Sequence, residues 1–229
     1  MRFKKITSEI ACSFTISPAG PMIIADSSSN RTNPERSDSC FLTSAVDGER
    51  VYVIPGSSIK GVVRSYVADY LSQQDIEILF GRTKQKPPLK SKISFSDAFA
   101  DMSTVETDIR YSTAITAIGQ SAKKGSLNSV EAVVKGNFHG EFRLKNADEK
   151  EFLYIIKAIN ALDNGEICIG GRKSRGFGTV RIKDFRLVVS NGFDIDLKPV
   201  ISAEYNGLDT LLNELEGGKI SLPTEELYV

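Results

Sequence analysis

The sequence predicts an α+β protein whose core is ferredoxin-like (RRM-like) and carries insertions. Three observations support this: two segments have apolar residues at helical spacing, several others alternate apolar and polar residues, and the segments follow one another twice as strand, helix, strand. Two such units on one antiparallel sheet are typical of a ferredoxin-like core. With 229 residues, the chain is long enough to bury a hydrophobic core.

Both predicted helices carry an apolar stripe of helical period. The first follows Gly56, and Ser57 or Ser58 is expected to cap it, because a serine hydroxyl can accept a hydrogen bond from an unpaired N–H of the first turn. Its stripe consists of Ile59, Val62, Val63, Tyr66, Val67, Tyr70 and Leu71. The second helix is expected over residues 148–163, with a stripe of Phe152, Ile155, Ile156, Ile159 and Leu162. One further helical turn is expected over residues 75–81.

The other segments of regular pattern are expected to be extended. They cover residues 3–17, 50–54, 93–99, 109–118, 130–144, 166–169 and 177–189. The small, polar and basic stretch between the fourth and fifth of them predicts a long hairpin or arm. Residues 18–47 have no periodicity, and a loop of this length inside a compact domain is usually functional or disordered.

The chain is therefore expected to form one domain over residues 1–193, with an inserted loop at 18–49 and an arm at about 112–136, followed by an acidic extension at 194–229. The extension holds eight acidic residues and two lysines, a net charge of −6. Because the whole chain is neutral, residues 1–193 carry +6. The extension could dock on a partner or be solvated, and its leucines could form one short amphipathic turn: Leu211, Leu212 and Leu215.

Basic residues of the body gather in three places. Residues 82–92 hold five basic residues and no acidic one, Lys123 and Lys124 are adjacent, and the segment GEICIGGRKSRGFGTV at 165–180 holds three more. A basic body can attract polyanions such as nucleic acid, although each cluster could also be a solvated loop. The glycine-rich segment itself could cradle a phosphate or form a tight hairpin with a solvated tip.

Several classes of function are disfavoured by what the sequence lacks. No apolar run approaches the roughly 20 residues that span a bilayer, and the N-terminus has no apolar signal region, so a cytoplasmic location is expected. The three cysteines are far apart with no CxxC pair, which argues against a zinc knuckle or a disulfide framework. His139 is the single histidine, which removes most histidine-based catalysis. The GxxxxGK[ST] spacing of a nucleotide-binding P-loop is missing.

The start of the first predicted helix has the chemistry of an anion site. Residues 56–60 place a glycine, two hydroxyls, unpaired backbone N–H groups and a lysine at a helix N-terminus. Such an end attracts anions through its dipole and its free donors. A capped helix with no ligand is the alternative interpretation.

Three segments, taken in order, resemble the RAMP superfamily of CRISPR-associated proteins. They are VIPGSSIKGVVRSYV at 53–67, KISFSDAF at 92–99 and IGGRKSRGFGTVRI at 169–182. The resemblance runs from about residue 8 to residue 187 and is nearest to the repeated backbone subunit of type III (Csm/Cmr-like) effector complexes. It implies a guide-RNA-binding subunit that meets guide RNA, target RNA, further copies of itself and other effector subunits. It also implies that the arm is a thumb that inserts into the guide–target duplex.

The resemblance also implies roles for particular residues. Phosphates of the guide RNA are expected to contact the helix start, the thumb and the glycine-rich loop, through Gly56, Ser57, Ser58, Lys60, Arg64, Lys123, Lys124, Gly171, Arg172, Lys173, Ser174 and Arg175. The glycine-rich loop is expected to face the helix start. Asp38 is the expected catalytic residue and metal ligand, with Asp26 in reserve, and the cofactor would be Mg²⁺ or Mn²⁺.

Three functions remain open at this stage. The first is a type III backbone subunit that cleaves guide-paired target RNA as a metal-dependent endoribonuclease. The second is a structural RNA-binding subunit of the same kind of complex without catalysis. The third is a free-standing basic enzyme or nucleotide-binding protein, which the charge distribution and the missing P-loop disfavour.

Overall fold

The structure is a computed structural model that describes residues 6–26, 37–82, 88–115, 122–123, 125–193, 199–220 and 222. The strands in this part of the chain are β1 (Ser8–Pro18), β2 (Thr43–Val46), β3 (Glu49–Ile54), β4 (Ile93–Phe95), β5 (Ala98–Ala100), β6 (Glu106–Ser112), β7 (Asn128–Lys135), β8 (Phe138–Lys145), β9 (Val180–Phe193) and β10 (Pro199–Asn206). The helices are α1 (Gly56–Val67), α2 (Gln73–Phe80), α3 (Glu149–Asn164) and α4 (Leu208–Glu216), with short 3-10 turns at Met102–Thr104 and Lys173–Arg175.

The main sheet has eight strands and is antiparallel. Its order is β10-β9-β1-β8-β5-β3-β2, and β4 pairs with β8 beside β5. Four of these strands, β9-β1-β8-β5, together with α1 and α3 as the two connecting helices, reproduce the strand-helix-strand pair of a ferredoxin-like core. The predicted α+β fold class is therefore confirmed.

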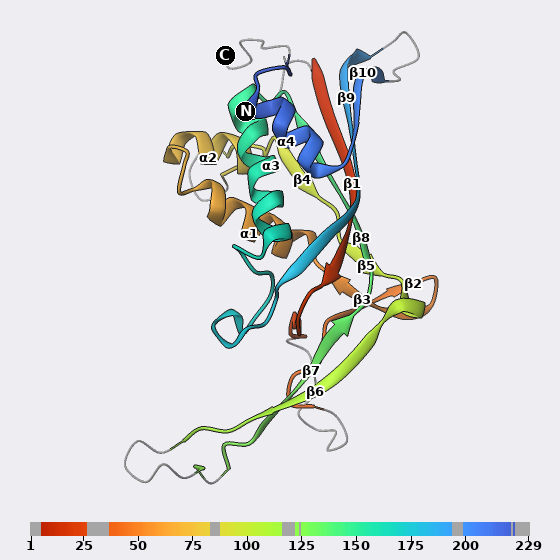
Figure 1. The fold of residues 1–229 in the computed structure, drawn as a ribbon, viewed down its shortest axis with the longest axis vertical. Coiled ribbons are helices and arrows are strands. Elements are labelled where there is room, and N and C mark those ends of the chain that lie inside the picture. The colour runs from red at the N-terminus through yellow and green to blue at the C-terminus, as the bar shows by residue number, and fades with distance from the viewer. Residues whose placement is uncertain are drawn as a thin grey trace.

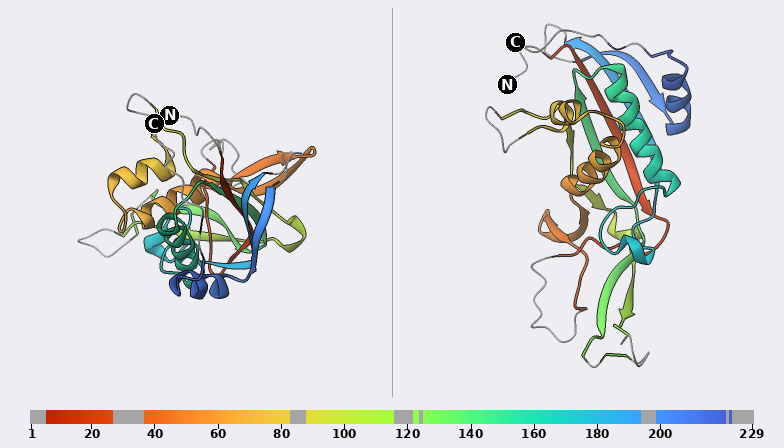
Figure 2. Two further views of the ribbon diagram at one scale, coloured as in Figure 1. Left: turned by 90° about the horizontal axis from the view of Figure 1, so that it is seen from above. Right: turned by 90° about the vertical axis from the view of Figure 1, so that its left-hand side faces the viewer.

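The helices lie on one face of the main sheet (Figures 1 and 2). The predicted stripes supply the buried side of both long helices, since Ile59, Val63 and Val67 of α1 and Phe152 and Ile156 of α3 are fully buried. They pack against alternate side chains of β1, which are Ile10, Cys12, Phe14 and Ile16. The period of the apolar pattern therefore predicted which faces form the core.

A two-stranded arm projects away from this body (Figure 1). It consists of β6 and β7, which pair in a separate sheet from Glu106–Lys135 at the body to Ser112–Asn128 further out. The arm carries exposed apolar side chains, with Ile109 48% and Tyr111 67% exposed. The segment that the sequence predicts as an arm is thus a twisted hairpin, and its tip at residues 116–121 lies outside the described residues.

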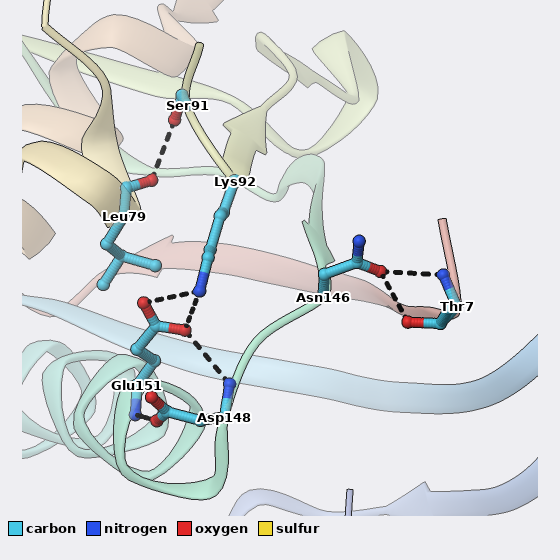
Figure 3. Close-up of polar contacts among 7 residues, drawn as sticks. All are labelled: Thr7, Leu79, Ser91, Lys92, Asn146, Asp148 and Glu151. Carbon is cyan, nitrogen blue, oxygen red and sulfur yellow. Dashed lines mark hydrogen bonds and ion pairs between the residues drawn. The ribbon is translucent and has the colours of Figure 1, made fainter. Parts of the chain in front are cut away.

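A buried ion pair connects the β4 end of the sheet to the start of α3 (Figure 3). Lys92 Nζ donates to both carboxylate oxygens of Glu151, at 2.9 and 2.6 Å, and each residue is 7% exposed or less. Glu151 also accepts the N–H of Asp148, whose own carboxylate accepts the N–H of Glu151, so the pair is part of a capping box. Lys92 is therefore a structural residue, although its sequence context is a basic loop.

Several element boundaries differ from the sequence prediction. Residues 166–169 form no strand, because Ile169 and Ile167 hydrogen-bond to Gly178 and Ala161 in the turn after α3 instead of a sheet neighbour. Residues 93–99 divide into β4 and β5, and residues 130–144 divide into β7 and β8. The last strand of the core begins at Val180 and continues to Phe193. These differences arise because a short apolar run, or two short strands in succession, can have the same apolar and polar residue pattern as one continuous strand.

The acidic C-terminal segment adds a strand and a helix to the core. β10 pairs with β9 at the sheet edge, and α4 packs on α3 with Leu208, Leu211 and Leu215 buried. The sequence predicts one short amphipathic turn here and misses β10, which has few buried residues. No helix among the described residues is both long and apolar enough to cross a membrane.

Candidate functional site beside the arm

The segment at residues 37–42 runs along the first residues of β7, in the outer part of the paired strands of the arm. Ser39 forms a parallel bridge with Val130: its N–H donates to Ser129 O at 3.2 Å, and the N–H of Glu131 donates to Ser39 O at 2.9 Å. The backbone of the residue that follows the predicted catalytic residue is therefore held by a regular strand.

The carboxylate of Asp38 is bound by Ser129. Oδ2 of Asp38 accepts the backbone N–H of Ser129 at 2.6 Å and its hydroxyl at 2.9 Å, and the N–H of Asp38 donates to Ser129 Oγ at 3.0 Å. Asp38 is nevertheless exposed. An ionised carboxylate that accepts two hydrogen bonds from one residue has a fixed direction, so Asp38 is both accessible and oriented.

Asp26 lies in the neighbouring chain segment and lines a cavity of about 360 Å³. Its N–H donates to Cys40 O at 3.0 Å, which joins two separate parts of the predicted loop. The cavity is lined by Asp26, Ser37, Cys40, Phe41, Thr43, Arg50, Tyr52, Met102, Thr107, Ile109 and Glu131. Glu131 accepts the hydroxyl of Tyr52 at 2.9 Å and the N–H of Phe41 at 3.3 Å. Asp38 does not line this cavity, although Ser37 does.

The donor set suits a hard divalent cation only in part. In the described ranges no group of three or more His, Cys, Asp or Glu side chains is placed to hold a metal ion. Mg²⁺ commonly binds through one or two carboxylates and completes its shell with water and substrate phosphate oxygens. The oriented, exposed carboxylate of Asp38 fits this kind of binding, in which the RNA would supply phosphate oxygens as further ligands.

The start of α1 is capped differently from the sequence prediction. Pro55 is the N-cap residue, no side chain of α1 caps the helix, and Ser57 is exposed. The N–H of Gly56 donates instead to Oδ1 of Asp97 at 2.8 Å. A side chain on residue 56 would collide with the backbone, since a Cβ would lie 2.4 Å from Phe95 O and 2.7 Å from Ser96 O. The turn at 55–58 and the segment around Asp97 are therefore one structural unit.

We expect Asp97→Ala to lower the free energy of unfolding by about 1 kcal/mol, because the first N–H of α1 loses its charged acceptor. Urea denaturation followed by circular dichroism measures the change. Asp69→Ala is a matched control, since Asp69 is also an exposed aspartate but lies after the end of α1. Equal stabilities for the Asp97 and Asp69 variants would contradict the capping role.

The two basic residues of α1 have contacts within the fold. Lys60 Nζ donates to Ser91 Oγ at 2.9 Å, and partial burial, followed by the nearby charge of Arg64, lowers the pKa of Lys60. The guanidinium of Arg64 lies 6.0 Å from the centre of the Phe80 ring. Arg64 is exposed and Lys60 half-buried, so contact of these residues with RNA stays a prediction.

The glycine-rich loop packs against the segment before Asp26. The N–H of Gly171 donates to Ile23 O at 2.9 Å, and Gly178 donates to Pro21 O at 2.9 Å. Gly170 has φ +86°, and a Cβ there would lie 2.3 Å from Ile23 O, so this approach of two backbones requires glycine. Beyond it, Lys173, Ser174 and Arg175 form an exposed 3-10 turn.

Arg172 connects this loop to the arm. Its Nη1 donates to Ser112 Oγ at 3.4 Å, and its Nη2 donates to Asn128 Oδ1. In the part of the chain that the structure describes, the hydrogen bonds of the loop go to the arm and to residues 21–23, and none goes to Ser57 or Ser58. The expected proximity of the loop to the helix start stays a prediction.

Of the two predicted lysines of the arm, Lys123 is among the described residues. Lys123 is exposed, and its N–H donates to Ala114 O at 2.8 Å across the hairpin. Lys124 lies outside the described residues. No sequence pattern indicates Ser129 or Glu131, because each lies about 90 residues along the chain from the loop residue that it binds.

Comparison with known proteins finds one family and two relatives. The family model described as the RAMP superfamily matches residues 41–181. The CRISPR system Cms endoribonuclease Csm3 of Enterococcus italicus is 29% identical over an alignment of 154 residues that covers 58% of this chain and 71% of that protein. The CRISPR system CMR subunit Cmr6 of Saccharolobus solfataricus is 44% identical over 46 residues, which are 20% of this chain and 15% of that protein.

Proposed function

Because the chain belongs to the RAMP superfamily, we propose that it is a backbone subunit of a type III CRISPR ribonucleoprotein that binds guide RNA along its phosphates and cleaves the paired target RNA. The RAMP resemblance inferred from the sequence is confirmed by the family match over residues 41–181. The similarity to Csm3, named as an endoribonuclease, supports RNA cleavage. Its partners would be guide RNA, target RNA, further copies of itself and other effector subunits.

The observation that carries the catalytic part of the proposal is the placement of Asp38. This aspartate is exposed, oriented by Ser129, and located beside the start of β7, toward the outer end of the paired strands of the arm. A duplex resting on the arm would bring a backbone phosphate within reach of this part of β7. The exposed charges of Lys173 and Arg175 lie on the loop that Arg172 joins to the same end of the arm. Phosphate contacts of this kind bind without reading sequence, as a subunit that accepts any guide requires.

In the proposed reaction the 2′-hydroxyl of the target strand attacks the adjacent phosphate and releases its proton to solvent. The bond from phosphorus to the 5′-oxygen of the next nucleotide breaks, that oxygen takes a proton from solvent, and a 2′,3′-cyclic phosphate and a 5′-hydroxyl result. Asp38 would hold Mg²⁺ or Mn²⁺, which supplies Lewis acidity toward the phosphate oxygens. Ser129 keeps the Asp38 carboxylate in place while the substrate enters. Exposure of Asp38 leaves room for RNA to approach. The alternative is a structural subunit with the same RNA contacts and no cleavage.

Guide binding is tested by neutralising the exposed turn. We expect the double variant Lys173→Ala, Arg175→Ala to bind single-stranded guide RNA several-fold more weakly, and to reduce the slope of log affinity against log salt by about 1.4, because two phosphate contacts are lost. Fluorescence anisotropy at several salt concentrations measures both quantities with the full chain.

The matched control is Lys150→Ala, Lys219→Ala, which removes the same charge from exposed residues at the helical side of the molecule. We expect this control to keep the wild-type salt slope. Equal losses in the two double variants would show a general charge effect and contradict a site at the loop. A wild-type chain that binds no guide RNA, alone or with its partner subunits, would contradict the proposed function as a whole.

A further inference from the structure

Arg172 is held in an unusual backbone conformation to make its contacts with the arm. Its φ of 58° lies in the left-handed region, which side chains other than glycine rarely adopt. Glycines surround it at positions 170, 171 and 176, yet this position carries an arginine. A strained residue persists where the surrounding structure fixes it, and such residues gather at functional sites.

The guanidinium of Arg172 bridges the two strands of the arm. Ser112 and Asn128, which accept its hydrogen bonds, are cross-strand partners, at the end of β6 and the beginning of β7. An arginine presents several donors in a rigid plane, so one side chain can bind both strands at once. The half-buried position of Arg172 contrasts with the exposed Lys173 and Arg175 that follow it.

The next residue along β7 is the one that binds Asp38. Asn128 accepts from Arg172, and Ser129 donates its N–H and its hydroxyl to the Asp38 carboxylate. A continuous set of contacts therefore runs from the glycine-rich loop through Arg172 to the start of β7 and on to Asp38. Because Ser129 uses its own backbone N–H, the direction of the Asp38 carboxylate depends on the position of the β7 backbone.

We propose that Arg172 is a positioning residue for RNA cleavage, which acts by fixing the β7 backbone at Asn128 and Ser129 and so the carboxylate of Asp38. This rests on the proposed function, because it assigns Arg172 a role in the reaction of Asp38. Arg172 then differs from its neighbours: Lys173 and Arg175 are exposed and are proposed to contact phosphate, whereas the Arg172 guanidinium is used within the protein.

The first test needs neither RNA nor cleavage. In the full chain without RNA, amide hydrogen exchange at Ser129 reports the bond between its N–H and Asp38. We expect Arg172→Ala to speed this exchange by about tenfold, and Asp38→Ala to do the same as a positive control. Arg175→Ala is the matched control from the same loop, and we expect it to leave Ser129 exchange unchanged. Wild-type exchange in Arg172→Ala would overturn the proposal.

The second test separates binding from chemistry in the assembled complex. We expect Arg172→Ala to keep guide affinity within about twofold while the single-turnover cleavage rate at saturating target falls about tenfold, because an interaction needed only for the reaction is lost. Arg175→Ala should instead weaken guide binding. An Arg172 variant that loses guide affinity as Arg175→Ala does would overturn the positioning role.

The third test asks whether the effect passes through Asn128. We expect Asn128→Ala to reduce the cleavage rate as Arg172→Ala does, and the double variant to be no slower than either single one, because both changes break the same contact. Fully additive losses would overturn the proposal. A wild-type complex that cuts no RNA would contradict the proposed catalysis. In that case the rate of amide hydrogen exchange at Ser129 would still decide whether Arg172 fixes the backbone of β7.

Discussion

Asp38→Ala is expected to reduce the rate of target RNA cleavage by about 100-fold or more while guide RNA stays bound, because the change removes the carboxylate that presents the metal to the phosphate. The Ser129 contacts show that this carboxylate is oriented rather than free to rotate in solvent. The measurement is a single-turnover assay with the assembled complex, complementary RNA and Mg²⁺ or Mn²⁺. Removal of the divalent metal with a chelator should give a similar loss in the wild type.

Two further variants make this prediction specific to Asp38. Asp38→Asn keeps the size of the side chain and can still accept from Ser129, so it tests the charge alone. Asp26→Ala is the matched control, since Asp26 lies in the adjoining segment and lines the neighbouring cavity. Undiminished cleavage in Asp38→Ala together with a loss in Asp26→Ala would transfer the catalytic role to Asp26. A wild-type complex that never cuts would favour the structural subunit.

Lys92→Met is expected to lower the free energy of unfolding by about 3–5 kcal/mol, because it leaves the carboxylate of Glu151 buried with no cation. Burial raises the pKa of Glu151, against the opposing influence of Lys92, which shows that desolvation already weighs on this carboxylate. For a chain of this size the loss corresponds to a fall in Tm of about 6–20 °C. Urea and thermal denaturation followed by far-ultraviolet circular dichroism measure it.

A double variant distinguishes a buried pair from a general loss of packing. In Lys92→Met, Glu151→Leu no charge is left buried, and we expect it to recover much of the stability lost in Lys92→Met. Lys90→Met changes an exposed lysine two residues away and should alter stability by about 0.5 kcal/mol or less. A Lys92 variant as stable as the Lys90 variant would contradict the structural role of the pair.

The elements that could be predicted from the sequence are those whose pattern is local and long. The stripes of α1 and α3 and the alternation of β1 extend over several turns or several residue pairs, and each predicted the buried side. Tyr70 is the exception, because it lies beyond the end of α1 at Val67 and is 53% exposed. The prediction was wrong for residues 166–169 and missed β10, because neither segment has a long local pattern. The first is an apolar run too short to separate a strand from a packed turn, and the second is a largely exposed edge strand.

The sequence could indicate a candidate site residue only where its type and its motif suggested a role without knowledge of its contacts. Asp38 could be chosen by resemblance, yet nothing near it in the sequence indicates Ser129, because their contact crosses 91 positions. The same limit applies to charge. In the sequence, Lys92 and Arg172 are both members of basic clusters. Only the fold shows that Lys92 pairs with Glu151 and that Arg172 binds the arm. Composition predicts how much charge a segment holds but not which way each side chain turns.

The capping of α1 by Asp97 showed a related limit. The helix start was expected to use its own serines, and the acceptor instead comes from the segment between β4 and β5. The absence of a Cβ at Gly56 permits that approach, so the glycine and the aspartate serve one contact. Two motifs that stand about 40 positions apart in the sequence are therefore halves of a single feature.

The attachment of residues 37–42 to β7 has a consequence for protein engineering. The strand that gives the arm its length also supplies the partners of Ser39 and Asp38. In a chimaera that carries the arm of a relative, the native loop would have to bind a β7 strand of different sequence. In a chimaera that carries only the loop of a relative, that loop would likewise have to bind a β7 strand other than its own. The loop and the arm are thus a single exchangeable cassette, and grafts between relatives should transfer both together.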